Sequence, residues 1–262
     1  MAAVIKLKRG TSTPSTSDIT SGEVAIDTSA KKLYINDSGT VKEIGGGSGG
    51  SGVSTDAQNN TWAGTDAGNS DNWGTAVENT TLYGHDAGAA LTTADKGVFI
   101  GDSAGKACTT GSYNHFFGYS AGSDITTGSN NLCSGLYAGY SVTSGSSNVL
   151  LGGTSAGSLT TGSDNVVVGQ GANLEGSASD NVIIGHYAGA WGTPENDGNV
   201  AIGSHVAEDL STGADNTIIG KHAASTGTND LTTGSNNIIL GHDAAASSAT
   251  VRIPVIRPSP ST

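Results

Sequence analysis

The segment NVLLGGTSAGSLTTGSDNVVVG (residues 148–169) contains one complete repeat of the pattern that governs most of the chain. An Asn, three apolar residues and a Gly recur in it after 17 residues. The glycines that end this pattern, here called marker glycines, recur with steps of 16 to 18 residues: Gly84, Gly101, Gly118, Gly135, Gly152, Gly169, Gly185, Gly203 and Gly220. Gly64 and Gly241 extend the series outward and bring it to eleven copies. Self-similarity at a nearly fixed period predicts a solenoid.

Each copy predicts a short strand, a tight turn and a second, shorter strand. β-branched residues crowd the positions after the Asn, as strands prefer, and the glycines supply turn conformations. The second strand is expected to point one apolar residue inward in front of each Thr-Thr or Thr-Ser pair: Leu91, Cys108, Ile125, Val142 and Leu159. No copy can bury its own apolar face, so the copies must stack. The fold class is therefore all-β, a parallel β-helix or β-roll with coils of about 17 residues.

A recurring Asn stands directly before many of the strands. In a parallel stack, identical amides lie above one another and share hydrogen bonds from coil to coil. We therefore expect a structural ladder from Asn148, Asn165, Asn181, Asn199, Asn216 and Asn237. The chain has two cysteines, Cys108 and Cys133, which take positions held by apolar residues in other copies and are expected to be small buried hydrophobes.

The predicted main strand is apolar on both of its faces. The residue two before the marker glycine and the residue one before it are both mostly apolar, and adjacent strand residues point to opposite sides. One face can line the interior of the solenoid, whereas the other would leave a long apolar stripe in water. Packing against further copies of the same chain around a common axis would cover that stripe. The pattern itself does not give the number of copies.

The repeat resembles the head repeat of trimeric bacterial adhesins, in which an Asn, apolar residues and a Gly are followed by Ala-Gly and a polar turn. NVAIG at residues 199–203 is the copy most like that motif. The resemblance implies parallel β-rolls that form a homotrimer, with the chains intertwined or side by side.

The beginning of the chain resembles a short module found at the N-termini of phage fibre-like proteins. IKLKR (5–9), SGEVAIDT (21–28) and KLYINDSGT (32–40) carry this resemblance. It implies a structural protein of a phage particle, docked onto other virion proteins through residues 1–44. Because the start of the chain does not look like a signal peptide, we expect the protein to be made in the host cytoplasm.

These observations divide the chain into four parts. Residues 1–44 form a small β attachment module, with strands expected at VIKLKR, EVAIDT, KLYIND and VKEIG. Residues 45–58 form a linker rich in Gly and Ser. Residues 59–247 form the repeat shaft, and residues 248–262 form a cap strand followed by an extended, Pro-rich tail.

Charge and hydropathy exclude several classes of function. The net charge is −12, with +1 on residues 1–44 and −13 on the remainder, and an acidic body argues against a nucleic-acid partner. No stretch approaches the ~20 apolar residues of a membrane span, so no membrane insertion is expected. The start MAAVIKLKRG has no apolar run typical of a signal peptide.

The chemistry-bearing residues favour a protein without catalysis or cofactor. Glycoside cleavage needs two carboxylates at close quarters, whereas the glutamates are scattered and the aspartates lie mostly in turns. Histidines follow several marker glycines, and a trimer could bring them together at its axis as metal or anion ligands, with His85, His186 and His242 as candidates. The alternative is that these histidines are polar turn residues.

The sequence therefore predicts a structural component of a bacteriophage virion: a trimeric fibre, spike or head-decoration protein that supports host attachment. The alternative is a receptor-binding adhesin that recognises host surface glycans. Exposed aromatic residues in the turns would then supply the sugar contacts: Tyr119, Tyr137, Tyr187 and Trp191.

Overall fold

The computed structural model describes residues 8–20, 23–28, 32–38, 40–44, 53–68, 77–189, 197–208, 210–225 and 233–244. Their strands form three sheets of four, twelve and two strands. None of the described residues belongs to a helix that is long and apolar enough to cross a bilayer. Trp191, most of the Gly/Ser linker and the predicted C-terminal cap and tail lie outside the described residues.

The first sheet is a small module that precedes the repeats. Its strands run in the order β1 (Lys8–Gly10), β2 (Val24–Asp27), β3 (Lys32–Asp37) and β4 (Thr40–Ile44). β1 pairs with β2 in parallel, whereas the other two pairs are antiparallel. Ile19, Ala25 and Tyr34 form its small core, and the Asn36 side chain donates to the Ile19 carbonyl oxygen at 2.6 Å. The strands overlap the four segments expected from the sequence.

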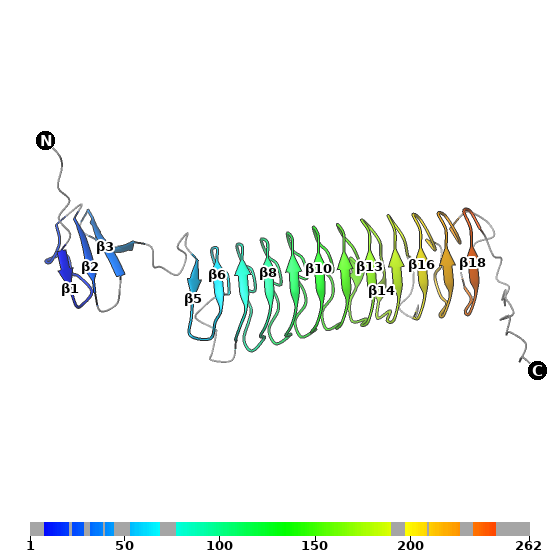
Figure 1. Ribbon diagram of the computed structural model, residues 1–262, viewed down its shortest axis with the longest axis horizontal. Helices are drawn as coiled ribbons and strands as arrows, with labels where there is room; N and C mark the ends of the chain where they lie inside the picture. The colour runs from blue at the N-terminus through cyan, green and yellow to red at the C-terminus, as the bar shows by residue number, and fades with distance from the viewer. Residues whose placement is uncertain are drawn as a thin grey trace, which may run out of the picture.

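The twelve-stranded sheet forms one side of a solenoid of about eleven coils, seen as a row of arrows in Figure 1. Its parallel strands are β6 (Thr61–Ala63), β7 (Thr81–Tyr83), β8 (Val98–Ile100), β9 (His115–Phe117), β10 (Leu132–Ser134), β11 (Val149–Leu151), β13 (Val166–Val168), β15 (Val182–Ile184), β16 (Val200–Ile202), β17 (Thr217–Ile219) and β18 (Ile238–Leu240). Each residue pairs with its equivalent one coil away, as Cys133 does with Phe116 and Leu150. The predicted parallel β-solenoid with coils of about 17 residues is confirmed.

The sequence predicts a second strand in every coil, and this prediction is wrong for most of the stack. Only β12 (Ser158–Leu159) and β14 (Glu175–Gly176) pair on that side, apart from one isolated bridge between Thr212 and Thr233, among the described residues. Successive N–H groups at the Thr pairs converge on one carbonyl of the next coil: Thr92 N, Thr93 N and Ala94 N all donate to Thr109 O, at 3.0, 3.1 and 3.3 Å. A carbonyl shared in this way interrupts the one-to-one hydrogen-bond pattern of a regular ladder.

The interior consists of three columns of side chains that run along the stack. The first is the middle residue of each strand, in which the rings of Phe99 and Phe116 stack with their centroids 4.7 Å apart. The second is a column of small residues three positions after the marker glycine, mostly Ala. The third holds the residues expected in front of the Thr pairs, all fully buried: Leu91, Cys108, Ile125, Val142 and Leu159.

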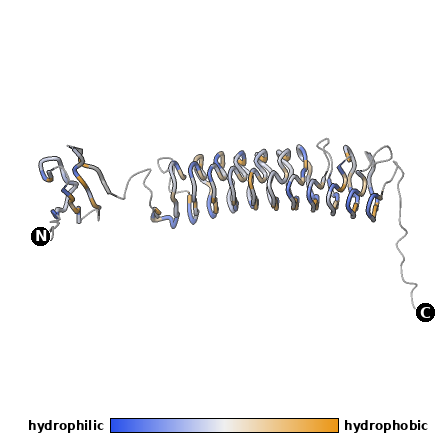
Figure 2. Tube along the Cα trace, turned by 90° about the horizontal axis from the view of Figure 1, so that it is seen from above, coloured by the Kyte–Doolittle hydropathy of each residue, from blue (hydrophilic) through white to orange (hydrophobic). Residues whose placement is uncertain are grey.

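The first and last residues of each strand point outward and remain partly exposed. Most of them are apolar, and the exposed fraction of the side chain reaches 41% at Ile100 and 59% at Leu240. Hydrophobic segments recur from coil to coil along the whole stack in Figure 2. We call this surface, formed by the outward residues of the eleven parallel strands, the strand face.

The marker glycines are required by the close approach of one coil to the next. Gly135 has a φ of +134°, and a Cβ on it would lie 2.5 Å from the carbonyl oxygen of Gly152. The neighbouring atom is backbone and belongs to another marker glycine, so it cannot move without disturbing the next coil. Gly153, directly after a marker glycine, differs: a Cβ there would have no heavy atom nearer than 3.9 Å.

We predict that Gly135→Ala lowers the free energy of unfolding by about 2–3 kcal/mol, because it combines a strained φ with a backbone clash. Gly153→Ala is the matched control and should stay within about 0.5 kcal/mol of the parent. Urea unfolding followed by circular dichroism, at one fixed protein concentration, measures both. Equal losses in the two variants would contradict the role given to the marker glycines.

The two cysteines lead to a further prediction. Burial raises the pKa of Cys108 to about 12 and also raises the pKa of Cys133, since the thiolate form is poorly solvated inside the stack. We expect neither thiol to react with Ellman's reagent at pH 8 until urea unfolds the chain, and both to react afterwards. The unfolded thiols ionise near pH ~8.5 while the folded ones stay protonated, so the free energy of unfolding should fall as pH rises above that value. Fast labelling of the folded protein would contradict this.

Candidate functional site

The Asn column forms a continuous network of hydrogen bonds inside the stack. Asn165 is fully buried, and its backbone N–H and its side-chain Nδ2 both donate to Asn148 Oδ1, at 3.1 and 3.0 Å. The same Nδ2 donates to Ala178 O at 2.8 Å, and Asn165 Oδ1 accepts from Asn181 N at 3.0 Å. Each amide therefore ties its own coil to both neighbours. The unbroken ladder consists of Asn114, Asn131, Asn148, Asn165, Asn181, Asn199, Asn216 and Asn237.

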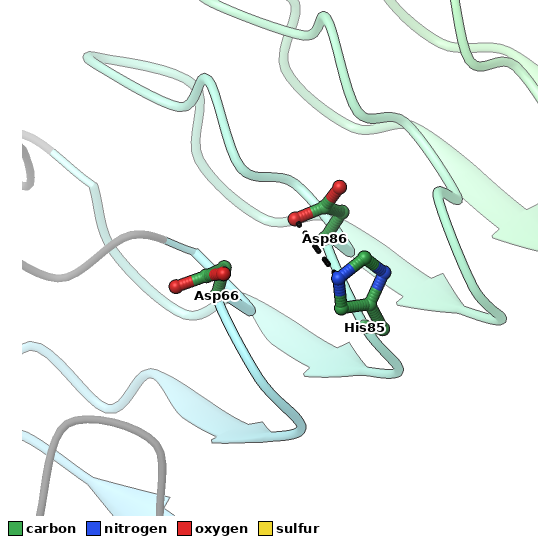
Figure 3. Close-up of side chains that lie close together, drawn as sticks. All are labelled: Asp66, His85 and Asp86. Atoms are coloured by element: carbon green, nitrogen blue, oxygen red, sulfur yellow. Dashed lines mark ion pairs between the residues drawn. The ribbon is translucent and has the colours of Figure 1, made fainter.

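The predicted metal candidate His85 lies in a cluster with Asp66 and Asp86 on the turns of two adjacent coils (Figure 3). One ligand atom from each residue lies within 4.8 Å of the others. His85 Nε2 is 3.7 Å from Asp86 Oδ1, while Lys106 Nζ is 2.7 Å from Asp86 Oδ2 and already neutralises that carboxylate. His85 and Asp66 are exposed. The cluster is therefore a surface network of ion pairs of the kind that contributes little energy.

The other two metal candidates, His186 and His242, lie in a row of neighbouring imidazole rings near the C-terminal end of the solenoid. The ring centroids of His186 and His205 are 5.5 Å apart, those of His205 and His222 are 5.1 Å apart, and those of His222 and His242 are 6.4 Å apart. His205 Nδ1 is 2.6 Å from Glu208 Oε1. Within the described part of the chain, these rings belong to no group of three potential metal ligands, because the Asp66, His85 and Asp86 cluster is the one such group found there.

Tyrosines occupy the same turns in the middle of the stack. Tyr119 and Tyr137 lie edge to face with centroids 5.2 Å apart, and Tyr137 and Tyr140 follow at 5.8 Å. A hydrogen bond between the hydroxyls of Tyr119 and Tyr137 raises the pKa of Tyr137. Tyr187 lies further along, with its ring centroid 4.3 Å from that of His186. All four tyrosines are exposed over more than a third of their surface.

A slot opens between two of these tyrosines, which we call the tyrosine slot. It has a volume of about 170 Å³ and is lined by Tyr140, Thr154, Gly157, Ser158, Gly171, Asn173 and Tyr187. Gly157 lies five residues after its marker glycine and Gly171 lies two residues after its own, and each is the only glycine at that position in the eleven coils. The missing side chains interrupt two surface columns and leave the space open.

Tyr187 is predicted from the sequence as a glycan contact, whereas Tyr140, Gly157 and Gly171 are not. The sequence does contain a signal for this slot. Gly157 and Gly171 stand in neighbouring copies at positions where the other copies carry a residue with a side chain. Aligning the copies would have shown it, but not which tyrosines lie beside the gap, since that depends on the directions of the side chains.

The clearly shifted carboxyl groups of the described residues all have a lowered pKa. A hydrogen bond from Lys8 lowers the pKa of Glu23 to about 2. Hydrogen bonds from Ser15 and Lys96 lower the pKa of Asp18 and Asp95, respectively. A general acid in glycoside cleavage requires the opposite shift.

Comparison of the chain with protein-family models, with curated proteins and with solved structures finds no match.

We predict that Asn165→Ala lowers the free energy of unfolding by about 2–4 kcal/mol, because it leaves the Asn181 N–H and the Ala178 carbonyl buried without their partner. Thr161→Ala, at an exposed position of the same coil, is the control and should change the free energy of unfolding by less than about 0.5 kcal/mol. Urea unfolding at fixed protein concentration compares the two. An Asn165→Ala variant as stable as the control would show that the ladder contributes little.

Proposed function

We propose that this chain is a structural component of a bacteriophage virion, a homotrimeric fibre, spike or head-decoration protein without catalytic activity. The single observation that carries the proposal is the strand face, an uncharged and largely apolar surface that runs the length of the solenoid.

The composition of the strand face supports assembly along its whole length. None of the first and last residues of the eleven parallel strands is Asp, Glu, Lys or Arg, although the chain carries 34 such residues elsewhere. With coils spaced by ~4.8 Å, the face is about 50 Å long. Apolar surface of that extent is rare on monomers and typical of interfaces. Since all copies present the same face, association around one axis covers it in each.

The choice of three copies rests on the resemblance of the repeat to trimeric adhesin heads. A parallel stack of three chains would bury the outward residues along a common axis. The Asn ladder and the marker glycines already tie each coil to its neighbours within one chain. Both sets of contacts favour a mechanical role, because no coil can open without breaking bonds to two others.

The small N-terminal module supports attachment to other virion proteins. It resembles the module that opens phage fibre-like proteins, and the part of it described here buries only a few side chains of its own. A sheet of this size gains stability by docking. We propose that residues 1–44 dock onto the particle, and that the protein is made in the host cytoplasm and carried by the virion.

The second candidate function is that of an adhesin that recognises host surface glycans. The tyrosine slot favours it, because aromatic walls beside hydroxyl and amide groups are typical of small-molecule sites. The two functions are compatible, since the slot belongs to the turns and the interface to the strands.

We predict that light scattering after size exclusion gives three times the 25.8 kDa chain mass. Adding Leu151→Lys and Ile202→Lys together places two charges on the strand face of each chain, and we expect the mass to fall to that of one chain, because buried unpaired charges are costly.

The matched control carries the same added charge away from the strand face. Thr127→Lys with Thr161→Lys changes two exposed residues on the opposite side of the coils and should leave the mass unchanged. Far-ultraviolet circular dichroism checks that both double variants keep their β-structure. A single-chain mass for the unaltered protein, or an unchanged mass for the strand-face variant, would overturn the proposed assembly.

A further inference from the structure

We propose that the tyrosine slot binds one ring of a neutral saccharide. The inference deepens the second candidate function and rests on it, because it assigns a particular site and a ligand class to glycan recognition. Its elements lie within four successive coils of a single chain.

Two aromatic rings lie against the backbone and leave the slot between them. A Cβ on Gly157 would lie 3.1 Å from Tyr140 Cε1, and a Cβ on Gly171 would lie 2.5 Å from Tyr187 Cε1. Each tyrosine therefore leans over a glycine of the adjacent coil, one from either side of the slot. Aromatic rings in this position present apolar surface and a partly negative face to the C–H groups of a sugar ring.

Tyr187 has the left-handed backbone conformation that every coil has at this position, as Tyr137 also does. Its φ is +50°, in the left-handed region that bulky residues rarely adopt. Other coils place Asp66, Ser103 or His205 at this position, so stacking of the coils does not require an aromatic residue there. The repeat therefore sets the left-handed backbone, whereas the aromatic side chain is a choice that the fold leaves free.

Polar groups at the base of the slot suit the hydroxyl groups of a sugar. Ser158 N donates to Asn173 Oδ1 at 3.1 Å, and Asn173 Nδ2 donates to Ser158 Oγ at 3.3 Å, which fixes both side chains. The Ser158 hydroxyl keeps its own proton for a further acceptor. Thr154 lies beside them with an exposed side chain.

The absence of charge in the slot selects the class of saccharide. None of the seven lining residues is charged, whereas the chain as a whole has a net charge of −12. An acidic sugar would find no cation in the slot and would be repelled by the surrounding charge. A volume of about 170 Å³ is below the range of sites for drug-sized ligands and suits a single ring.

The slot remains accessible in the proposed trimer. Its residues lie two to six positions after their marker glycines, in the turn that follows each parallel strand and just after that turn. The residues of the strand face come before those glycines. Ligand binding therefore does not depend on assembly, and the failure of one proposal can be distinguished from failure of the other.

Saturation-transfer difference NMR on the full chain tests the proposal with three neutral probes: maltose, cellobiose and diacetylchitobiose at millimolar concentration. We expect transfer to the ring protons of one sugar unit in at least one probe, and a loss of roughly tenfold or more in affinity when Tyr140→Ala and Tyr187→Ala are combined. Tyr140→Phe with Tyr187→Phe keeps the rings and should keep most of the transfer.

The control is Tyr113→Ala, which removes an exposed tyrosine from a different column and should leave transfer unchanged. Light scattering on the same samples reports the assembly state separately. No transfer to any of the three probes, or equal transfer with the double alanine variant, would overturn the proposal whatever the number of chains in the particle.

Discussion

The whole stack depends on the close approach of successive backbones at the marker glycines. At Gly135 the carbonyl oxygen of Gly152 in the next coil lies 2.5 Å from where a Cβ would stand, and the same contact recurs along the solenoid. This approach aligns the coils in register, so each residue lies above its equivalent. Only in that register can Asn165 reach both Asn148 and Asn181, and only then do Phe99 and Phe116 stack. The polar ladder and the apolar columns are thus consequences of one backbone contact.

A single sequence shows which residues repeat and at what spacing. It therefore predicts the parts of the fold that are the same in every coil. The coil length, the placing of Leu150 and Leu151 on opposite faces of the strand and the Asn column follow from the spacing alone. Which of the two faces points inward does not, because both are apolar, and the structure shows that it is the face of Leu150. The absence of the second strand from most coils could not be predicted, because β-propensity does not report that Thr92 N and Thr93 N share one acceptor. The same limit applies to Tyr140, whose importance depends on a side-chain direction beside a gap.

Repetition inside the stack leaves the turns free to vary. Interior positions accept few residues, since a change in one coil meets the equivalent residue of the next. The turn positions after the marker glycines carry Asp86, Lys106, Tyr137 and His205 in different coils, with no common chemistry. Charge gathers on these turns and is absent from the strand face. An acidic, hydrated turn surface disfavours side-to-side contact between rods and leaves the strand face as the preferred surface for association.

The two ends of the solenoid differ in whether a further parallel strand could pair there. At the N-terminal end β5 (Ser54–Thr55) runs antiparallel to β6, so the series of parallel strands stops there. At the other end Asn237 Oδ1 is buried and has no donor among the described residues. In every earlier rung of the ladder that oxygen accepts from the next coil, as Asn216 Oδ1 does from Asn237 N at 3.0 Å. A cap strand after β18, as the sequence predicts, would have to supply this donor, because an unpaired amide oxygen in the interior is costly and an open edge invites pairing with another rod.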